Sequence, residues 1–170
     1  MIKIVLTGPE CTGKTTLSNE IAHKCNTIVV QEYARQYLHN LNRPYNYEDL
    51  KTISKGQLNL EKKIIKQNPN KPIIVCDTNL QVIKIWSMVK YGKCDPFIMN
   101  HEDKDAIYVL CYPDFKWIYD PLRENKNDRK KLYKIYKDDL IENNRNFITV
   151  KGSIYERTEL LCQTIIKLKE

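Results

Sequence analysis

The sequence predicts an α/β fold, in which about five parallel strands form a sheet with helices on both faces. Three observations predict it. Short apolar segments rich in Ile and Val alternate with longer segments whose apolar residues recur at helical spacing. Polar residues follow several of the apolar segments, as expected where parallel strands end beside a ligand. The 170 residues, 42% of them hydrophobic and 29% charged, are enough for one domain spanning 1–170.

Five segments have the pattern of buried strands. Each is short and mostly apolar, which is typical of parallel strands that are covered on both faces. A proline, an asparagine or a charged residue lies within a few positions of each end, which limits the length of each strand. The five expected strands are 2–6, 27–30, 73–76, 106–112 and 147–150.

The helices are predicted from apolar spacing and from capping residues. Leu17 and Ile21 lie one turn apart after the first strand. Asn46 has the side chain of a helix cap and predicts a long helix over 47–66. Further helical patterns follow the third strand, precede the fifth and end the chain, with their apolar positions at Val82, Trp86, Val89, Leu132, Tyr136, Leu140, Ile154, Leu161, Ile165 and Leu168.

The first expected strand leads into a phosphate-loop motif. Residues 8–15, Gly-Pro-Glu-Cys-Thr-Gly-Lys-Thr, match G-x-x-x-x-G-K-[ST] at every fixed position. Glycines let the backbone wrap closely around phosphate groups, and the start of the next helix adds its positive end. The sequence therefore predicts an ATP site with Mg²⁺, formed by Gly8, Glu10, Cys11, Thr12, Gly13, Lys14, Thr15 and Thr16.

The motif and a later acidic residue predict specific chemical roles. Lys14 is expected to bridge the β- and γ-phosphates as a catalytic cation, and the Thr15 hydroxyl to bind Mg²⁺. Asp77 follows four apolar residues, as does a strand-end acid that holds the metal directly or through water. An ordinary helix cap is the alternative for Asp77.

A second carboxylate follows the second expected strand. Glu32 lies where it would face the acceptor hydroxyl and take its proton, although a helix N-terminus also favours Glu. Whether Glu32 or Asp77 is the base stays open at this point. Arg35 is one helical turn beyond Glu32 and either pairs with it or contacts the substrate.

A polar segment over about 120–130 is predicted to be a short mobile lid. Arg123 and Arg129 are expected to fold over the transferring phosphate, spread its charge and exclude water. Residues 116–137 hold eight basic and three acidic residues, so most of the net charge of +7 lies in and around this segment. The positive charge is thus interpreted as a phosphate-binding feature, and no nucleic-acid partner is expected.

Other patterns exclude several classes of protein. The longest unbroken apolar run, 106–112, is too short to span a membrane, so a cytoplasmic protein with no membrane partner is expected. The six cysteines show no close pairing in the sequence and are expected to be reduced thiols. Residues 70–73, Asn-Lys-Pro-Ile, depart from the guanine-reading N-K-x-D motif at the last position, which argues against a GTPase. A small-molecule kinase remains.

Five motifs in this order resemble the NadR family, and within it the ribosylnicotinamide kinase domain. They are the phosphate loop 8–17, Glu-Tyr-Ala-Arg at 32–35, Lys-Gly-Gln-Leu at 55–58, Cys-Asp-Thr-Asn at 76–79 and Tyr-Asp-Pro-Leu-Arg at 119–123. The similarity extends to Gly152 and Arg157. It implies a P-loop kinase fold in which the Asp77 strand lies beside the phosphate-loop strand.

The resemblance also implies an activity. It is the transfer of a phosphoryl group from ATP to the 5′-hydroxyl of nicotinamide riboside in NAD salvage, giving nicotinamide mononucleotide. The alternatives are a kinase for another nucleoside and a regulatory module that binds ATP and a pyridine nucleotide without turnover. Some relatives have a ring-stacking aromatic before the acid at Glu32, where this chain has Gln31. The expected acceptor-binding residues are Glu32, Tyr33, Arg35, Asn79 and Trp86, with stacking assigned to Tyr33 or Trp86; Trp86 would otherwise pack in the core.

Overall fold

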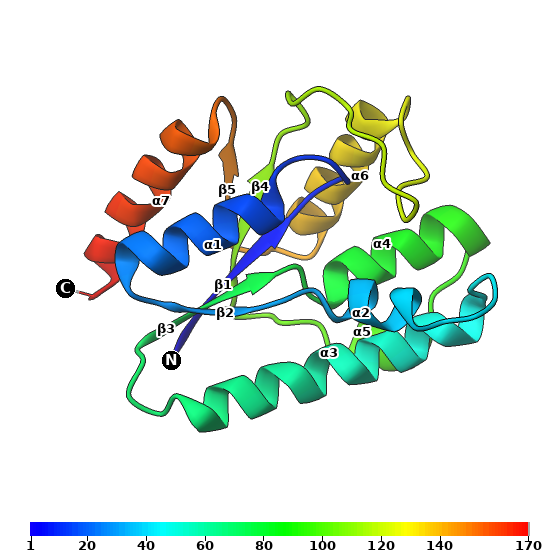
Figure 1. Cartoon of the computed structure of the whole chain (residues 1–170), viewed down its shortest axis with the longest axis horizontal. Coiled ribbons are helices and arrows are strands. Elements are labelled where there is room, and N and C mark those ends of the chain that lie inside the picture. The colour runs from blue at the N-terminus through cyan, green and yellow to red at the C-terminus, as the bar shows by residue number, and fades with distance from the viewer. Residues whose placement is uncertain (170) are drawn as a thin grey trace.

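The structure is a computed structural model that describes residues 1–169 (Figure 1). Its centre is a five-stranded sheet in the order β2-β3-β1-β4-β5, with every neighbouring pair parallel. The expected α/β architecture is therefore confirmed, including the placement of the Asp77 strand beside the first strand. The strands are β1 (Ile2–Thr7), β2 (Ile28–Val30), β3 (Ile73–Asp77), β4 (Ile107–Cys111) and β5 (Phe147–Val150).

Helices cover both faces of this sheet (Figure 1). α1 (Lys14–Cys25) and α7 (Ile154–Lys169) pack on one face, and α3 (Tyr47–Gln67), α4 (Leu80–Tyr91) and α6 (Arg129–Glu142) pack on the other. α2 (Tyr33–His39) and α5 (Pro96–Asn100) pack against α3 and α4 beside the sheet. Within residues 1–169, no helix combines the length and the apolar character needed to cross a membrane.

The strand register brings three chain segments to one edge of the sheet. Along β1, Ile4 and Leu6 face α1 and α7, whereas Val5 faces the opposite layer. Leu6 pairs with Asp77 of β3, and Thr7 of β1 pairs with Leu110 of β4. Because the strands are parallel, the residues that follow β1, β3 and β4 leave the sheet at the same edge.

Capping residues explain where two helices begin. The Asn46 side chain accepts hydrogen bonds from the N–H groups of Glu48 and Asp49, and Asp49 accepts one from the Asn46 N–H. This capping box starts α3 where the sequence predicts it. α5 was not expected, because its five residues are too few for a helical pattern. The Asp95 side chain caps it by accepting from the Phe97 N–H.

The expectation that all six cysteines are reduced thiols is wrong for two of them. Cys25 at the end of α1 and Cys162 in α7 form a disulfide, with 6.1 Å between their Cα atoms. The two residues are 137 positions apart, so the sequence gives no sign of the pair. They meet because α1 and α7 lie side by side on the same face of the sheet (Figure 1). Cys11, Cys76, Cys94 and Cys111 are free thiols.

Gly56 is required by the packing of α2 on α3. A Cβ atom at this position would lie 2.0 Å from Cε1 of Tyr33, which begins α2. We therefore expect Gly56→Ala to lower the free energy of unfolding by about 1–3 kcal/mol, as overpacking does. Urea denaturation monitored by circular dichroism measures this change.

The matched control places the same substitution in a Tyr33→Ala background. Without the ring, alanine in the middle of α3 should be neutral, or stabilising by up to about 1 kcal/mol, because it favours helix more than glycine does. An equal loss in both backgrounds would show that Tyr33 is not the reason for the glycine.

Candidate active site

The phosphate-loop motif forms the connection between β1 and α1. Gly8 has a φ of 121°, and a Cβ atom there would lie 2.8 Å from the carbonyl oxygen of Cys111 in β4. Gly13 has a φ of 78° and is the N-cap of α1. Only glycine combines this conformation with this close approach at Gly8. The two fixed glycines of the motif thus set the path of the loop over the edge of the sheet.

Hydrogen bonds within the loop hold its polar side chains. The Lys14 Nζ donates to the carbonyl oxygens of Gly8 at 2.9 Å and Pro9 at 2.7 Å. The Thr12 hydroxyl donates to the same Pro9 oxygen at 3.0 Å. The Lys14 ammonium therefore lies over the loop, close to the start of α1. Both the side-chain charge and the helix N-terminus favour an anion at this place.

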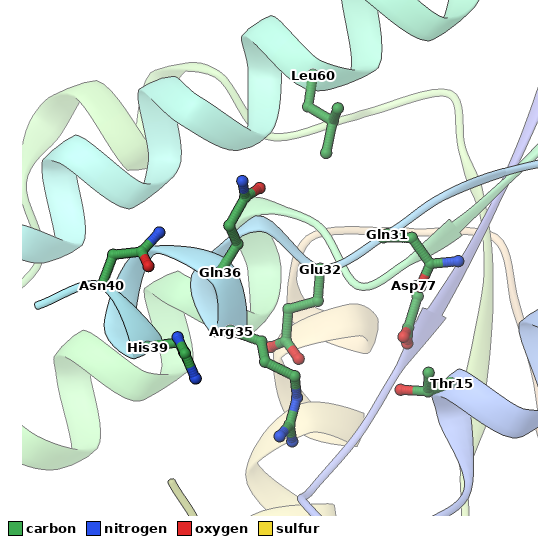
Figure 2. Close-up of a pocket in the computed structure, with 9 residues that line it drawn as sticks. All are labelled: Thr15, Gln31, Glu32, Arg35, Gln36, His39, Asn40, Leu60 and Asp77. Atoms are coloured by element: carbon green, nitrogen blue, oxygen red, sulfur yellow. The ribbon is translucent and has the colours of Figure 1, made fainter.

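Asp77 and Thr15 face one another beside the loop. Figure 2 shows the Asp77 carboxylate, the Glu32 carboxylate and the Thr15 hydroxyl pointing into the same space from three elements. This space belongs to a cavity of about 380 Å³. Asp77 is 2% exposed, and its burial raises the pKa of the carboxyl; hydrogen bonding from Thr15 and the charges of Lys14 and Arg35 oppose this effect.

The oxygen atoms of this cluster fit a Mg²⁺ ion. Asp77 Oδ1 is buried and has no hydrogen-bond partner among residues 1–169. A buried carboxylate oxygen without a partner is unfavourable unless a ligand satisfies it. Mg²⁺ prefers carboxylate and hydroxyl oxygens, which Asp77 and Thr15 provide.

Glu32 is positioned by α3. The Gln57 side-chain oxygen accepts the Tyr33 N–H at 2.9 Å, which holds the first turn of α2 directly after Glu32. Gly56 allows the Tyr33 ring to pack on α3. The Lys-Gly-Gln-Leu segment therefore orients Glu32 without reaching the cavity. Burial is the main reason that the pKa of the Glu32 carboxyl is raised; the Asp77 charge adds to the rise, and Lys14 opposes it.

A larger cavity of about 520 Å³ lies on the other side of Glu32. It joins the phosphate loop to a chamber between α2, α4 and α6. Thr15, Glu32 and Arg35 line both cavities, so the two spaces adjoin at these three residues. Besides the loop residues 8–16, the larger cavity is lined by Glu32, Ala34, Arg35, Leu38, Tyr45, Val82, Ile85, Trp86, Val89, Lys90, Leu122, Arg123, Glu124, Asn125, Leu132 and Tyr136.

Acidic side chains tie the 120–130 segment to the rest of the site. Asp120 accepts a hydrogen bond from Arg35 at 3.0 Å. Glu10 of the phosphate loop accepts the N–H groups of Glu124 and Asn125. The Glu124 carboxylate forms an ion pair with Lys90 of α4 at 2.8 Å and accepts the Tyr45 hydroxyl. The segment therefore lies along the larger cavity, and its residues 122–125 line it.

The two arginines of this segment have different surroundings. Arg123 lines the larger cavity, and its guanidinium lies 6.0 Å from the centre of the Trp117 ring. Arg129 lies outside both cavities, and its guanidinium donates to the carbonyl oxygens of Cys11 and Phe115. Arg129 therefore joins the start of α6 to the phosphate loop.

The structure separates the expected acceptor-binding residues into two groups. Glu32, Arg35 and Trp86 line the larger cavity. Tyr33 packs against Gly56 and lies outside both cavities. Asn79 is 1% exposed; its oxygen caps α4 through the Gln81 N–H, and its amide donates to the Tyr108 hydroxyl. Arg35 forms its ion pair with Asp120, and its charge still lowers the pKa of Glu32.

Sequence reasoning missed the aromatic residues around Trp86. Tyr45 accepts a hydrogen bond from the Trp86 ring nitrogen at 2.9 Å, and the two rings meet edge to face at 4.8 Å. Tyr136 reaches the cavity from α6, where burial raises the pKa of its hydroxyl and keeps it protonated. The chain has eleven tyrosines, and no motif marked these two as cavity residues. The sequence predicted Tyr136 only as an apolar helix position, together with Leu132 and Leu140.

A family model described as AAA domain matches residues 3–157 of the chain. The chain belongs to this AAA domain family. The trifunctional NAD biosynthesis/regulator protein NadR of Salmonella typhimurium (strain LT2) is 27% identical over 172 residues. That alignment covers 96% of this chain and 42% of the NadR protein, so the chain spans less than half the length of the curated relatives that it matches.

Solved structures confirm the P-loop kinase-like fold of this AAA domain. A NadR protein in complex with NR aligns with a TM-score of 0.73 at 20% identity, over 89% of this chain and 46% of the other. Deoxyadenosine kinase from M. mycoides aligns with a TM-score of 0.63 at 20% identity, over 98% and 100% of the two chains. The resemblance to NadR that the five motifs predicted is also confirmed.

The buried charge of Asp77 should lower the stability of the ligand-free protein. Because folding raises the pKa of Asp77, its contribution to stability decreases as the pH rises above the unfolded-state value. Asp77→Asn is therefore expected to raise the melting temperature at pH 7 and to remove most of the stabilisation by ATP with Mg²⁺. Thermal denaturation with and without the ligands measures both effects.

Asp49→Asn is the matched control, for which we expect the opposite change in melting temperature. Arg43 lowers the pKa of Asp49, so the ionised form stabilises the fold above the unfolded-state pKa and this stability is lost as the pH falls. This substitution should lower the melting temperature. A lower melting temperature for both variants would contradict the interpretation of Asp77.

Proposed function

We propose that this domain is a kinase that transfers the γ-phosphoryl group of ATP to the 5′-hydroxyl of nicotinamide riboside, forming nicotinamide mononucleotide. One observation carries the proposal most directly: a single cavity joins the phosphate loop, the Glu32 carboxylate and a chamber lined by aromatic and aliphatic side chains. This arrangement provides a phosphate donor site, a base and room for the ring of an acceptor.

The phosphate loop would bind and orient the donor. Its backbone follows the path set by Gly8 and Gly13. The Lys14 ammonium, which now donates to two backbone carbonyl groups of the loop, would donate to phosphate oxygens when ATP binds. Phosphoryl transfer depends chiefly on positioning and on neutralising charge. Mg²⁺ held by Thr15 and Asp77 would add positive charge on the phosphates.

Glu32 would act on the acceptor hydroxyl. It lines both cavities, whereas Asp77 lines only the smaller one, next to Thr15. This difference favours Glu32 as the group that accepts the proton and Asp77 as the metal ligand. The buried surroundings that raise the pKa of Glu32 make the carboxylate more basic, which suits a proton acceptor.

The 120–130 segment would close the site. Arg123 lines the cavity and would neutralise charge on the transferring phosphoryl group. Arg129 would hold the end of the segment on the phosphate loop. Asp120, Glu124 and Glu10 hold the segment against the body of the domain. A closed segment excludes water, which would otherwise compete with the acceptor hydroxyl.

The chemistry of the chamber supports a nucleoside acceptor. Trp86 and Tyr45 form its aromatic wall, and Val82, Ile85 and Val89 of α4 extend it with apolar surface. The Trp86 ring would stack on the acceptor base, a role that the resemblance to NadR implies for an aromatic residue at position 31, where this chain has Gln31. The solved relatives include a NadR protein in complex with NR, which supports nicotinamide riboside as the acceptor.

A kinase for another nucleoside is the second candidate. It is favoured by the similarity to deoxyadenosine kinase over the whole length of that protein and by the presence of Gln31. A third reading is a regulatory module that binds ATP and a pyridine nucleotide without turnover. The cavity-lining positions of Glu32 and Arg123 favour a kinase, because a sensor does not need groups for transfer.

Release of ADP from ATP distinguishes these functions. We expect release with nicotinamide riboside and little with deoxyadenosine, deoxycytidine or thymidine. Lys14→Ala should lose activity by several orders of magnitude, because it removes the cation from the transferred phosphate. Release with a deoxynucleoside alone would support the second candidate. ATP binding without release for any acceptor would support the sensor.

The pH dependence of kcat/KM tests the role of Glu32. Because its pKa is raised and the base must be ionised, activity should rise with pH through a value above the ordinary glutamate pKa of about 4.3. Glu32→Gln should lower kcat by about 10²- to 10⁴-fold and remove this limb, whereas Glu32→Asp should keep it. An unchanged acid limb in Glu32→Gln would assign the base elsewhere.

A further inference from the structure

Arg157 is the largest fully buried side chain among the described residues. It lies in the first turn of α7, far from the phosphate loop in sequence, and its side chain has no exposed surface. The proposed transfer reaction makes no use of it. A buried guanidinium is unfavourable unless its donors are satisfied, so its partners indicate what this charge does.

Those partners are backbone carbonyl groups from three different loops. Nη1 donates to Thr12 at 2.8 Å, Nε to Gly152 at 3.0 Å and Nη2 to Tyr112 at 3.2 Å. Asp114 supplies the one carboxylate, and its second oxygen accepts the Gly152 N–H at 2.6 Å. The guanidinium thus joins the loops that follow β1, β4 and β5 at the edge of the sheet.

The bond to Thr12 fixes a peptide group of the phosphate loop. The Thr12–Gly13 peptide is trans and planar, so the Thr12 carbonyl and the Gly13 N–H point in opposite directions. The carbonyl points to Arg157 in the interior, and the N–H therefore points away from it. Both residues line the larger cavity, which is the space that a phosphate bound by the loop would occupy.

Packing restricts the guanidinium to this arrangement. Its Cζ lies 4.5 Å from the centre of the Phe115 ring, which stacks on its face. A Cβ atom on Gly13 would lie 2.9 Å from Ile154 and 3.0 Å from Phe115, so Phe115 packs against both the guanidinium and the loop. The planar fork of arginine reaches three carbonyl groups at once, and a lysine ammonium cannot reproduce this geometry.

We propose that Arg157 is a positioning residue for phosphate binding, because it orients the Gly13 N–H of the phosphate loop toward the triphosphate. This inference deepens the proposed function and rests on the binding of ATP by the loop. It does not depend on which acceptor is phosphorylated. A role confined to joining α7 to the sheet is the alternative.

The test measures the binding of ATP and of inorganic tripolyphosphate by isothermal titration calorimetry, without acceptor. Arg157→Lys should weaken both by about 10- to 100-fold, as expected when phosphate-binding groups lose their orientation. The KM for the acceptor should change by less than about twofold. Asp114→Asn keeps the arginine and removes its counter-charge, and it should weaken both ligands in the same direction by a smaller factor.

Lys3→Met is the matched structural control. Lys3 forms a half-buried ion pair with Glu61 and Asp103, with both distances 2.7 Å, at the opposite end of β1. Its removal should lower the melting temperature and leave binding of both phosphate ligands unchanged. If Arg157→Lys does not fold, the test is whether Asp114→Asn weakens binding of the two phosphate ligands more than Lys3→Met does.

Two results would overturn the proposal. The first is that a folded variant, Arg157→Lys or Asp114→Asn, binds tripolyphosphate and ATP as tightly as the wild type. Arg157 would then have a purely structural role, and the proposed kinase activity would be unaffected. The second is that the wild-type protein binds neither ligand, which would overturn both this inference and the proposed function.

Discussion

The parallel pairing of β1 with β3 and β4 is the constraint on which the site depends. It places the phosphate loop, Asp77 and the residues that follow β4 at one edge of the sheet. At that edge Gly8 passes so close to the carbonyl of Cys111 that no side chain fits between them. The loop is therefore set by the neighbouring strand as well as by its own sequence, and the cavity takes its position from the loop.

Ionisation of two carboxyl groups in the site, Glu32 and Asp77, is unfavourable. Burial raises the pKa of both Glu32 and Asp77, and one oxygen of Asp77 has no partner in the part of the chain that is described. Lys14 and Arg35 compensate for only part of this effect. Binding of a cation together with a phosphate group would offset this unfavourable charge, and ATP with Mg²⁺ supplies both. For the proposed ATP site, we therefore expect that substitutions which relieve this charge stabilise the ligand-free fold and weaken ligand binding.

Charge also explains how the 120–130 segment is held against the rest of the domain. The segment is basic overall, and its acidic members form the contacts that hold it. Asp120 binds Arg35, Glu124 binds Lys90, and Glu10 of the phosphate loop accepts two backbone N–H groups from the segment. These contacts leave Arg123 at the cavity, and Arg129 donates to backbone carbonyl groups.

The sequence by itself determined the elements whose cause is local: the phosphate loop, the capping box at Asn46 and the apolar strands that require a covered parallel sheet. The candidate site was predictable where a residue ends a strand or lies just beyond one, as Asp77 and Glu32 do. The tertiary structure alone decided which distant residues meet there. The disulfide between Cys25 and Cys162, the partners of Arg157 and the Tyr45–Trp86 wall each join segments far apart in the chain. Their contacts arise from helix packing on the sheet, which leaves no local pattern of spacing in the sequence.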